Sequence, residues 1–293
     1  MAKVSVIIPT HNRPEPLYKA VSSVLNQTYK DLEVIVVDGG LDRRAEEVVR
    51  DLNDPRVAYI KSDKDLNGSE ARNIGIRRAG GEFIALLDDD DEWLSEKLDI
   101  QMKAFEHTPR EVGFCFSAVK NVYDNKIQDT KVPSGIRDYF EVVLARLKGF
   151  LSVTLIVKKY VLEDVGYFDE RLPSHQETEL VLRISKKYKG LGINQPLVLV
   201  SMRKGYEKVG FDINKRIVGR EIIINKYMED YKKRPVIFAG QLFRQGLLHR
   251  SNDQMTKARD YFKKAWDTDH RPLYILHYLS LIGGGRIYRW FRK

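Results

Sequence analysis

The chain has 293 residues and a net charge of +9, with hydrophobic residues at 43% and charged residues at 31%. This length predicts one large domain or a domain with an appendage, and the composition allows a sizeable core. The surplus of positive charge indicates an anionic partner, which is nucleic acid, a phosphate-bearing ligand or an anionic membrane surface. The single cysteine, Cys115, excludes an intrachain disulfide and suits a reducing compartment.

The beginning of the chain and its apolar runs predict where the protein resides. The first residues lack the basic, apolar and small-residue succession of a signal peptide. No stretch approaches the ~18 to 20 apolar residues that span a bilayer. We therefore expect a cytoplasmic protein, and peripheral attachment to the inner face of the cell membrane stays open.

The first hundred residues alternate short apolar runs with amphipathic stretches. The apolar runs predict strands buried on both faces, and the amphipathic stretches predict helices, the third of them capped by Ser69. This rhythm predicts an α/β layer with right-handed crossovers. The expected strands are 4–8, 33–37, 57–60 and 83–87, and the expected helices are 14–25, 43–52, 69–79 and 93–106.

The second half of the chain mixes strands and helices up to about residue 210 and is helical after it. This change in character predicts a domain boundary near residue 210. One or two strands are expected in 112–124, and others at 126–130, 152–157 and 196–201. The expected helices are 137–148, a short one from 158, and 175–187. Four more helices are expected at 214–231, 236–248, 253–266 and 273–282.

The most informative stretch is Phe83–Trp93, with the sequence FIALLDDDDEW. A buried strand here ends in four aspartates, although two unit charges ~4 Å apart repel by roughly 4 kcal/mol near a protein surface. In an extended chain Asp88 and Asp90 lie on one face, where they can offer oxygens to one hard cation such as Mg²⁺ or Mn²⁺. The alternative is a solvated acidic turn that caps the following helix.

Polar side chains follow three of the expected strands, in Thr10–Arg13, at Asp38 and in Asp88–Asp91. In an open sheet such strand ends gather in one crevice. The carboxylates there can accept hydrogen bonds from a base or ribose, or hold a metal on a diphosphate, and Arg72 can pair with phosphate oxygens. The chain has neither GxxxxGK[ST] nor GxGxxG, so the usual phosphate-binding loops are excluded, and it has no Cys/His zinc spacing.

Five pieces of the chain resemble the family 2 glycosyltransferases, which have a GT-A fold. They follow the family's order and cover about residues 3–205: VSVIIPTHNR (4–13), AVSSVLNQTYKDLEVIVVDGG (20–40), NGSEARNIGIRRAGGEFIALLDDDDEW (67–93), VGYFDE (165–170) and HQETELVLRI (175–184). The resemblance implies a Rossmann-like mixed sheet flanked by helices, with an all-helical C-terminal extension. It also implies a catalytic domain at 1–210, with a nucleotide-sugar half at about 1–100 and an acceptor half at 101–210, and an extension at 211–293.

The resemblance implies roles for particular residues. Asp88–Asp90 resemble the family's DXD element, in which Asp88 contacts the ribose and Asp90 ligates the Mn²⁺ or Mg²⁺ that bridges the donor diphosphate. Arg72 belongs to the ARN element near that diphosphate. The expected nucleotide-sugar-binding residues are Thr10, Asn12, Arg13, Asp38, Asn67, Arg72, Asp88 and Asp89.

The chain departs from the family pattern at the catalytic base. Members usually show Glu-Asp before an aromatic residue and a short helix that ends in LR, whereas this chain has Gln176, Glu177 and Thr178. Glu177 keeps the carboxylate on a side chain longer by one methylene and is the expected base, with Glu179 as the neighbouring alternative. A second, minor departure is Asp38-Gly39-Gly40, where the family often has Asp-Asp-Gly or Asp-Gly-Ser.

The C-terminal region carries two further patterns. Residues 239–265 resemble one tetratricopeptide-like helical hairpin, which cannot bury its own face, so we expect it to pack on the catalytic domain or on a partner. Residues 283–293 mix aromatic residues with Arg286, Arg289, Arg292 and Lys293. They either lie on an anionic membrane or form a solvated C-terminus.

These observations predict a metal-dependent inverting glycosyltransferase of the hexosyltransferase type. The expected partners are a nucleotide-diphosphate sugar and a glycan or lipid-linked acceptor hydroxyl, and no nucleic acid is expected. Two alternatives stay open, which are a sugar-phosphate nucleotidyltransferase and a non-catalytic binding or scaffold protein on the same fold. The sequence names neither the sugar nor the nucleotide nor the acceptor.

Overall fold

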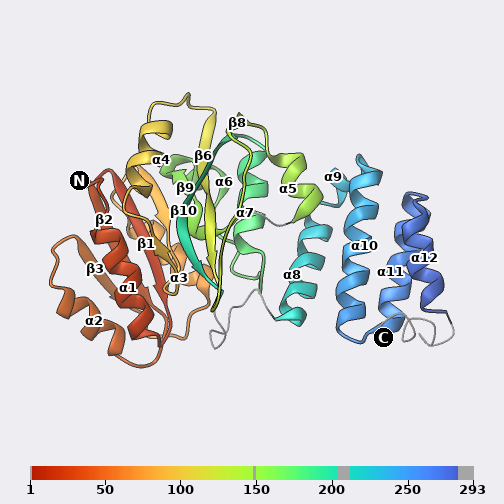
Figure 1. Cartoon of the computed structure of the whole chain (residues 1–293), viewed down its shortest axis with the longest axis horizontal. Helices are drawn as coiled ribbons and strands as arrows, with labels where there is room; N and C mark the ends of the chain where they lie inside the picture. The colour runs from red at the N-terminus through yellow and green to blue at the C-terminus, as the bar shows by residue number, and fades with distance from the viewer. Residues whose placement is uncertain (1, 148–149, 203–211, 283–293) are drawn as a thin grey trace. The chain divides into compact units, whose positions relative to one another are not determined.

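The computed structural model describes residues 2–147, 150–202 and 212–282 (Figure 1). The chain divides into two compact units. The first comprises Met1–Phe140, Gly149–Glu170 and Gln176–Tyr206, and the second comprises Glu141–Lys148, Arg171–His175 and Glu207–Lys293. The second unit thus takes two short segments from the middle of the chain, and the expected boundary at residue 210 stays a prediction.

The first unit is built on a mixed sheet of ten strands, in the order β3-β2-β1-β4-β9-β6-β10-β5, with β7 beside β6 and β8 beside β10. Strand β1 runs parallel to both β2 and β4, whereas β9 is antiparallel to β4 and β6. The strands are β1 (Val4–Thr10), β2 (Leu32–Asp38), β3 (Val57–Lys61), β4 (Phe83–Leu86), β5 (Glu92–Trp93), β6 (Val112–Val122), β7 (Ile127–Asp129), β8 (Gly135–Arg137), β9 (Ile156–Lys158) and β10 (Lys189–Ser201).

Helices cover both faces of this sheet, which explains why its central strands are apolar without alternation. Val6 and Ile8 of β1 belong to the same buried cluster as Leu17 of α1. Ile7 points the other way, where Gly75 of α3 lies so close that no side chain would fit. The helical elements of this unit are α1 (Pro14–Leu25), α2 (Arg44–Leu52), α3 (Gly68–Arg78), α4 (Lys97–Phe105), the 3₁₀ turn η1 (Ser152–Thr154), α6 (Lys159–Val165) and α7 (Gln176–Ser185).

All the regular elements described in the second unit are helices, whereas its segment Arg171–His175 forms turns and bends. Helices α10 and α11 are joined by three residues, and Phe243 of α10 lies 5.4 Å from Phe262 of α11 between ring centroids. Helix α12 packs on α11. The helices are α5 (Phe140–Arg146), whose first residue falls in the first unit, α8 (Ile213–Lys226), α9 (Met228–Lys232), α10 (Pro235–Ser251), α11 (Met255–Thr268) and α12 (Pro272–Ser280).

The predicted mixed α/β sheet flanked by helices, with helices alone toward the C-terminus, is confirmed. Some local predictions are wrong. The helix expected from Trp93 begins at Lys97, because Trp93 pairs with Val198 in the short strand β5. The strand expected at 152–157 is the turn η1 followed by β9, and the helix expected at 214–231 is divided at Tyr227.

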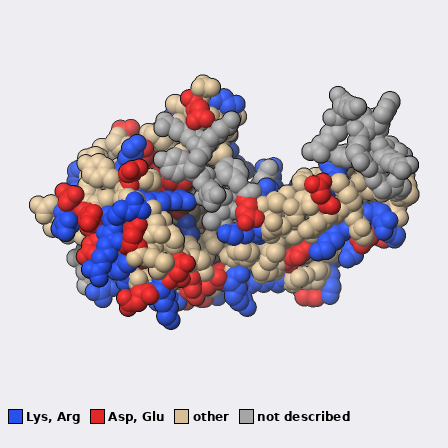
Figure 2. Space-filling model, turned by 90° about the horizontal axis from the view of Figure 1, so that it is seen from below, with Lys and Arg blue, Asp and Glu red and all other residues tan. Residues whose placement is uncertain are grey.

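The structure bears on two predictions, those of an anionic partner and of contact with a membrane. On the face that Figure 2 shows, basic and acidic side chains are interspersed, so the net charge of +9 is not gathered into one patch there. Within the described ranges, no helix combines the length and the apolar character needed to cross a bilayer. Residues 283–293, where we expect membrane contact, lie outside the described residues.

Candidate functional site

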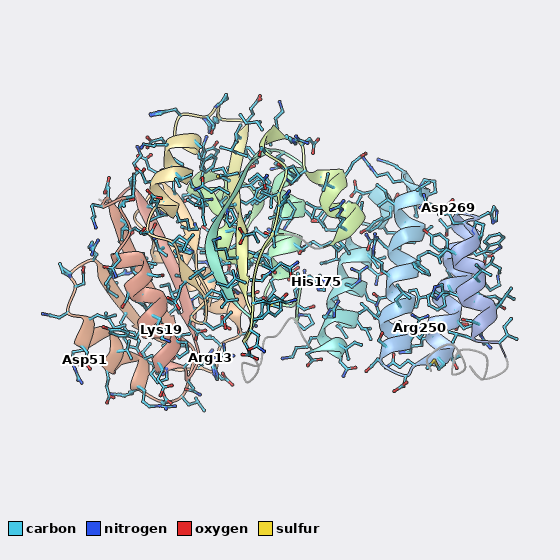
Figure 3. The ribbon with its side chains drawn as sticks, viewed as in Figure 1. Arg13, Lys19, Asp51, His175, Arg250 and Asp269 are labelled. Atoms are coloured by element: carbon cyan, nitrogen blue, oxygen red, sulfur yellow. The ribbon has the colours of Figure 1, made fainter. Side chains whose placement is uncertain are left out.

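The carboxyl ends of β1, β2 and β4 lie side by side, and polar side chains meet there. In the parallel register Thr10 is paired with Asp38, and β4 runs along the other edge of β1. The Thr10 hydroxyl donates a hydrogen bond of 2.8 Å to Asp89 Oδ2, although 79 residues separate the two in sequence. Arg13 follows the same strand end (Figure 3). The structure therefore brings residues from separate strand ends into one cluster.

Asp88 is held by two side chains from other elements. Arg72 Nη2 of α3 donates to Asp88 Oδ1 at 2.6 Å, and the Ser152 hydroxyl of η1 lies 3.3 Å from both Asp88 oxygens. Arg72 is nearly buried, 5.6 Å from the centroid of the Phe168 ring, and its Nε is a buried donor without a hydrogen-bond partner among the described residues. Burial opposes the charge on Arg72, but Asp88 and, more weakly, Glu177 outweigh it and raise the pKa of the guanidinium.

Asp89 and Asp90 share Arg13 as a cationic neighbour. Arg13 Nη1 lies 3.4 Å from Asp89 Oδ1 and 3.8 Å from Asp90 Oδ2. Burial raises the pKa of Asp89 to about 6, against the opposing effects of the Thr10 hydrogen bond and of Arg13. The expected repulsion among the aspartates is thus offset in part by Arg13 and Arg72, and in part by a weaker tendency of Asp89 to ionise.

The aspartates do not alternate as they would in an extended strand. Strand β4 ends at Leu86, and a turn follows in which Asp91 N donates to Asp88 O at 3.3 Å. The buried Asp91 points to another strand and accepts a hydrogen bond of 2.9 Å from Ser201 N of β10. The argument that placed Asp88 and Asp90 on one face is therefore wrong, because the turn sets their directions.

Asp38 is buried at the end of β2 and accepts hydrogen bonds from three neighbouring groups. Its Oδ2 accepts hydrogen bonds from Tyr59 at 2.7 Å and from Lys61 Nζ at 2.9 Å, and its Oδ1 accepts from Gly40 N at 2.8 Å. Lys61 also donates to the carbonyl of Gly40, at 2.6 Å. No sequence pattern predicts that Lys61 pairs with Asp38. The hydrogen bonds that Asp38 accepts leave only its remaining lone pairs for a nucleobase.

The departure at Gly39 and Gly40 has a steric cause. A Cβ on Gly40 would overlap the Asn12 side chain, and one on Gly39 would lie 2.8 Å from Leu66 Cβ. Asn12 adopts a left-handed φ of 55°, which asparagine tolerates, and its Oδ1 accepts a hydrogen bond from Leu41 N at 3.1 Å. In this structure Asn12 thus shapes the loop after β2.

Asn67, an expected donor-binding residue, is the N-cap of α3. Its Oδ1 accepts hydrogen bonds from Ser69 N and Glu70 N, and Glu70 returns one to Asn67 N, which completes a capping box. The expected cap by Ser69 is therefore wrong by two residues. Capping fixes the start of the helix that carries Arg72.

Glu177 lies in the first turn of α7 and belongs to the same electrostatic cluster as Arg72. Burial raises the pKa of Glu177, while Arg72 lowers it and Asp88 raises it further. This coupling links the expected base to Arg72 of α3 and to Asp88 after β4. A buried carboxyl with a raised pKa beside a guanidinium group is a candidate for proton transfer.

Glu179, the alternative base, is wholly buried and serves another purpose. Arg183 Nε donates to both Glu179 oxygens at 2.9 Å, and Arg183 Nη2 donates to the carbonyl of Tyr167 at 2.6 Å. From the other side, Asn73 binds both the N–H and the carbonyl of Phe168, at 2.9 and 3.0 Å. Glu179 therefore helps to fix the loop that places Phe168 beside Arg72.

The carboxylates of the cluster fit only one kind of metal site. Across the described ranges no group of three or more His, Cys, Asp or Glu side chains is arranged to hold a metal ion. The donor set is nevertheless hard oxygen, and Mg²⁺ commonly takes one or two protein carboxylates while substrate phosphates and water supply the rest. The residues present thus fit a cation that arrives with a diphosphate, and do not fit an all-protein cage.

Comparison with known proteins decides the family. Residues 5–160, more than half of the chain, match the model of glycosyl transferase family 2. This chain belongs to glycosyl transferase family 2. The prediction made from the five sequence pieces is thereby confirmed.

Two curated relatives illustrate the similarity. An uncharacterized glycosyltransferase, MJ1057 of Methanocaldococcus jannaschii, is 32% identical over 194 residues, which are 64% of this chain and 66% of that protein. A GalNAc(5)-diNAcBac-PP-undecaprenol beta-1,3-glucosyltransferase of Campylobacter jejuni is 42% identical over 119 residues, 39% of this chain and 38% of that protein. The chain therefore spans less than two thirds of the length of these relatives.

Two solved structures show the fold. S. aureus TarS 1–349 in complex with UDP-GlcNAc has a TM-score of 0.66 at 20% identity, covering 99% of this chain and 91% of that one. The mannosyltransferase PcManGT of Pyrobaculum calidifontis, in complex with GDP-Man and Mn²⁺, has a TM-score of 0.58 at 18% identity, covering 99% and 84%. The predicted GT-A fold is confirmed by these likenesses.

Proposed function

We propose that this member of glycosyl transferase family 2 moves a sugar from a nucleotide-diphosphate sugar to a hydroxyl group of a glycan or lipid-linked acceptor, with inversion at the anomeric carbon. The observation that carries the proposal is the cluster of Arg72, Asp88, Ser152 and Glu177 at the end of β4. The complex of TarS with UDP-GlcNAc and the undecaprenol-linked substrate in the name of the Campylobacter jejuni relative support it.

The donor half of the proposal rests on residues that are already held in place. Asp88, fixed by Arg72 and Ser152, keeps oxygen lone pairs for a ribose hydroxyl. The buried Nε of Arg72 has no hydrogen-bond partner in the described part of the chain and suits an oxygen of the diphosphate. The loops around this site are held by hydrogen bonds of Thr10, Asn12 and Asp38, and Asn67 caps helix α3. Groups fixed in advance need little reorganisation when negative charge develops on the leaving diphosphate.

The acceptor half of the proposal rests on Glu177. The acceptor hydroxyl gives its proton to the Glu177 carboxylate, and its oxygen attacks the anomeric carbon on the face opposite the diphosphate. The bond from that carbon to the diphosphate oxygen breaks, and the electron pair leaves with the diphosphate next to Arg72. A single displacement of this kind inverts the configuration. Glu179 is not the base we propose, because its two oxygens are bound to Arg183.

Asp90 is the residue we propose for a divalent metal, Mn²⁺ or Mg²⁺, by the fit described above. The metal would neutralise charge on the leaving diphosphate when it is bound. The complex of PcManGT with Mn²⁺ supports this assignment. Arg13, which lies 3.8 Å from Asp90, supplies positive charge beside that carboxylate from the chain itself.

Replacement of Asp90 tests the metal and the donor together. We expect Asp90→Asn to abolish Mn²⁺-dependent release of sugar from UDP-, GDP- or dTDP-sugars and to weaken Mn²⁺-nucleotide binding in calorimetry. Asp91→Asn is the matched control, since an asparagine oxygen can still accept from Ser201 N. Equal metal-dependent turnover by Asp90→Asn and the wild type would end the assignment.

The two alternative functions give different products. A nucleotidyltransferase releases pyrophosphate from a sugar phosphate and a nucleoside triphosphate, and a scaffold protein turns over neither substrate. Incubation with each substrate pair, followed by chromatography of the nucleotides, separates the three functions. The ordered Arg72–Asp88–Ser152 contacts favour the glycosyltransferase over a decayed site.

A further inference from the structure

Two arginines, Arg216 and Arg220, lie one turn apart on α8 of the second unit and have no acidic partner among the residues that the structure describes. Arg220 is only 4% exposed, and its Nη2 and Nε donate to Gln241 Oε1 at 2.6 Å and to Gln245 Oε1 at 3.3 Å. Both glutamines are wholly buried on α10. Within the described parts of the chain, neither Arg216 nor Arg220 forms an ion pair, and the Arg216 side chain makes no hydrogen bond.

This arrangement leaves a buried positive charge without compensation. Buried charges are normally paired with an opposite charge, because removing an ion from water is costly. The two glutamines satisfy N–H groups of Arg220 but bring no negative charge. Burial, then Arg244 and Arg216, lower the pKa of Arg220 to about 10, against the opposing effect of Tyr231, so the neighbouring cations repel it. An anionic ligand would supply the charge that this face lacks.

A third nitrogen-bearing side chain lies on the same face. Helix α8 approaches the segment 171–175 at Gly219, where a Cβ would lie 2.5 Å from the Ser174 hydroxyl. That hydroxyl lies 2.8 Å from His175 Nδ1 and donates to the carbonyl of Lys215 at 2.9 Å. Gly219 lies between Arg216 and Arg220 in the sequence, so the segment that carries His175 lies beside this stretch of α8.

The backbone and the electrostatics at His175 agree with this placement. Its φ is 61°, a left-handed value that is uncommon for a residue other than glycine and that often marks functional positions. Burial, then Arg220 and Arg216, lower the pKa of His175 to about 4. At neutral pH the imidazole is therefore uncharged beside two guanidinium groups. Because the Ser174 hydroxyl donates its proton to the carbonyl of Lys215, His175 Nδ1 donates to that hydroxyl and Nε2 remains a hydrogen-bond acceptor.

We propose that Arg216 and Arg220 form a phosphate-binding site in the helical unit, next to the uncharged His175. Guanidinium groups bind phosphate oxygens through paired hydrogen bonds, and they do so most strongly where water is excluded. Arg216 is half-buried and offers its donors to a ligand, while Arg220 stands behind it on Gln241 and Gln245. The close approach at Gly219 and the Ser174 hydroxyl fix His175 beside them.

The phosphate that we assign to this site belongs to the acceptor, and this assignment rests on the proposed function. His175 precedes the proposed base Glu177 by two residues in the sequence, and two residues of chain extend at most about 7 Å. The donor diphosphate has its own proposed partner in Arg72. An acceptor that carries a phosphate or diphosphate group is therefore the ligand that we assign to this site.

Binding of inorganic pyrophosphate to the full chain tests the site without any turnover. Calorimetry at constant ionic strength, without divalent metal, compares the wild type with three variants. We expect Arg216→Gln to weaken binding by about tenfold or more, as for a lost hydrogen bond to a charged group. Arg259→Gln is the matched control, because it removes the same charge from the exposed face of α11. Arg72→Gln reports on pyrophosphate bound at the donor site.

Each outcome decides the proposal. Selective loss of binding in Arg216→Gln, at an unchanged melting temperature, supports it. Equal binding by Arg216→Gln and Arg259→Gln, loss in Arg72→Gln alone, or no binding by the wild type at millimolar pyrophosphate overturns it. The assignment to the acceptor has its own test in transfer assays, where Arg216→Gln is expected to raise KM for a phosphate-bearing acceptor and not for a plain glycoside. Absence of transfer to either acceptor by the wild type would instead count against the proposed function.

Discussion

Glu177 is the residue whose surroundings set the pH range of the proposed reaction. Burial raises its pKa above the ordinary value of 4.5, with Arg72 opposing that effect. The base works only when it is ionised, so activity falls as the pH falls through this raised pKa. We expect the acid limb of the kcat/KM profile to lie above pH 4.5 and Glu177→Gln to lower kcat by about 10² to 10⁴-fold, with nucleotide affinity unchanged.

The neighbouring carboxylate provides a control for this prediction. Glu179→Gln leaves the nearly buried Arg183 without its charge partner, and breaking a buried pair costs roughly 3 to 5 kcal/mol. We therefore expect Glu179→Gln to lower the melting temperature, whereas Glu177→Gln leaves it nearly unchanged. A stable but inactive Glu179→Gln beside an active Glu177→Gln would show that the base lies two residues further along.

At the scale of elements, the turn η1 is the part of the site that could not be predicted from the sequence pattern. Trp93 Nε1 donates to the carbonyl of Val153 and Gln101 Nε2 to that of Thr154, both at 3.0 Å. These bonds take up carbonyl groups that a regular strand would use, and they turn Ser152 toward Asp88. The sequence pattern of residues 152–157 is that of a strand. The side chains that bind the carbonyl groups of this turn lie more than fifty residues away, so the local pattern does not reveal the turn.

Replacement of Ser152 tests whether this turn positions the donor site. Ser152→Ala removes one hydrogen bond to Asp88, so we expect about tenfold weaker binding of UDP or GDP. Thr154→Val is the control, because it removes the bond from Thr154 to the carbonyl of Leu151 within the same turn without touching Asp88. The decisive readout is the ratio of affinities for ribo- and 2′,3′-dideoxynucleotides. A ratio unchanged in Ser152→Ala would reduce the residue to a structural role.

Other elements show which predictions a sequence supports. Strands β1, β2, β3 and β4 match their predicted ranges within two residues, because a buried parallel strand is apolar throughout. The predicted helix at 93–106 loses its first turn because Trp93 pairs with Val198, 105 residues later. The cap of α3 is misplaced since Asn67 and Ser69 are both good caps, and only the capping box with Glu70 selects Asn67. Local patterns thus predict the elements, and distant partners decide their ends.

At the scale of the molecule, the donor site joins parts of the chain that sequence patterns treat separately. The strand-end rule is sufficient to name Thr10, Asp38 and Asp88 as candidates. This rule does not predict which side chains pair, because the hydrogen bonds from Lys61 to Asp38 and from Ser152 to Asp88 join different elements. The proposed phosphate-binding site in the helical unit has no sequence signal, since an arginine on a helix is usually solvated.

The C-terminal region carries the prediction of membrane contact. Helix α12 and the two residues after it carry four exposed large apolar side chains. They follow one another every three residues: Leu273, Leu276, Leu279 and Ile282. Residues 283–293, outside the described residues, add four basic side chains, and each basic residue near an anionic bilayer contributes ~1 kcal/mol. Together they fit attachment to the surface of an anionic membrane, where a lipid-linked acceptor resides.

Co-sedimentation with liposomes tests this attachment. We expect the full chain to pellet with anionic liposomes at low salt and a chain ending at Ile282 to pellet less. The charge-dependent part of the binding is expected to weaken as salt is raised, whereas insertion of apolar side chains is not. Leu276→Gln in the full chain separates the two contributions, since it removes apolar surface and no charge. Equal and negligible pelleting of the full and shortened chains would leave the C-terminus as ordinary solvated surface.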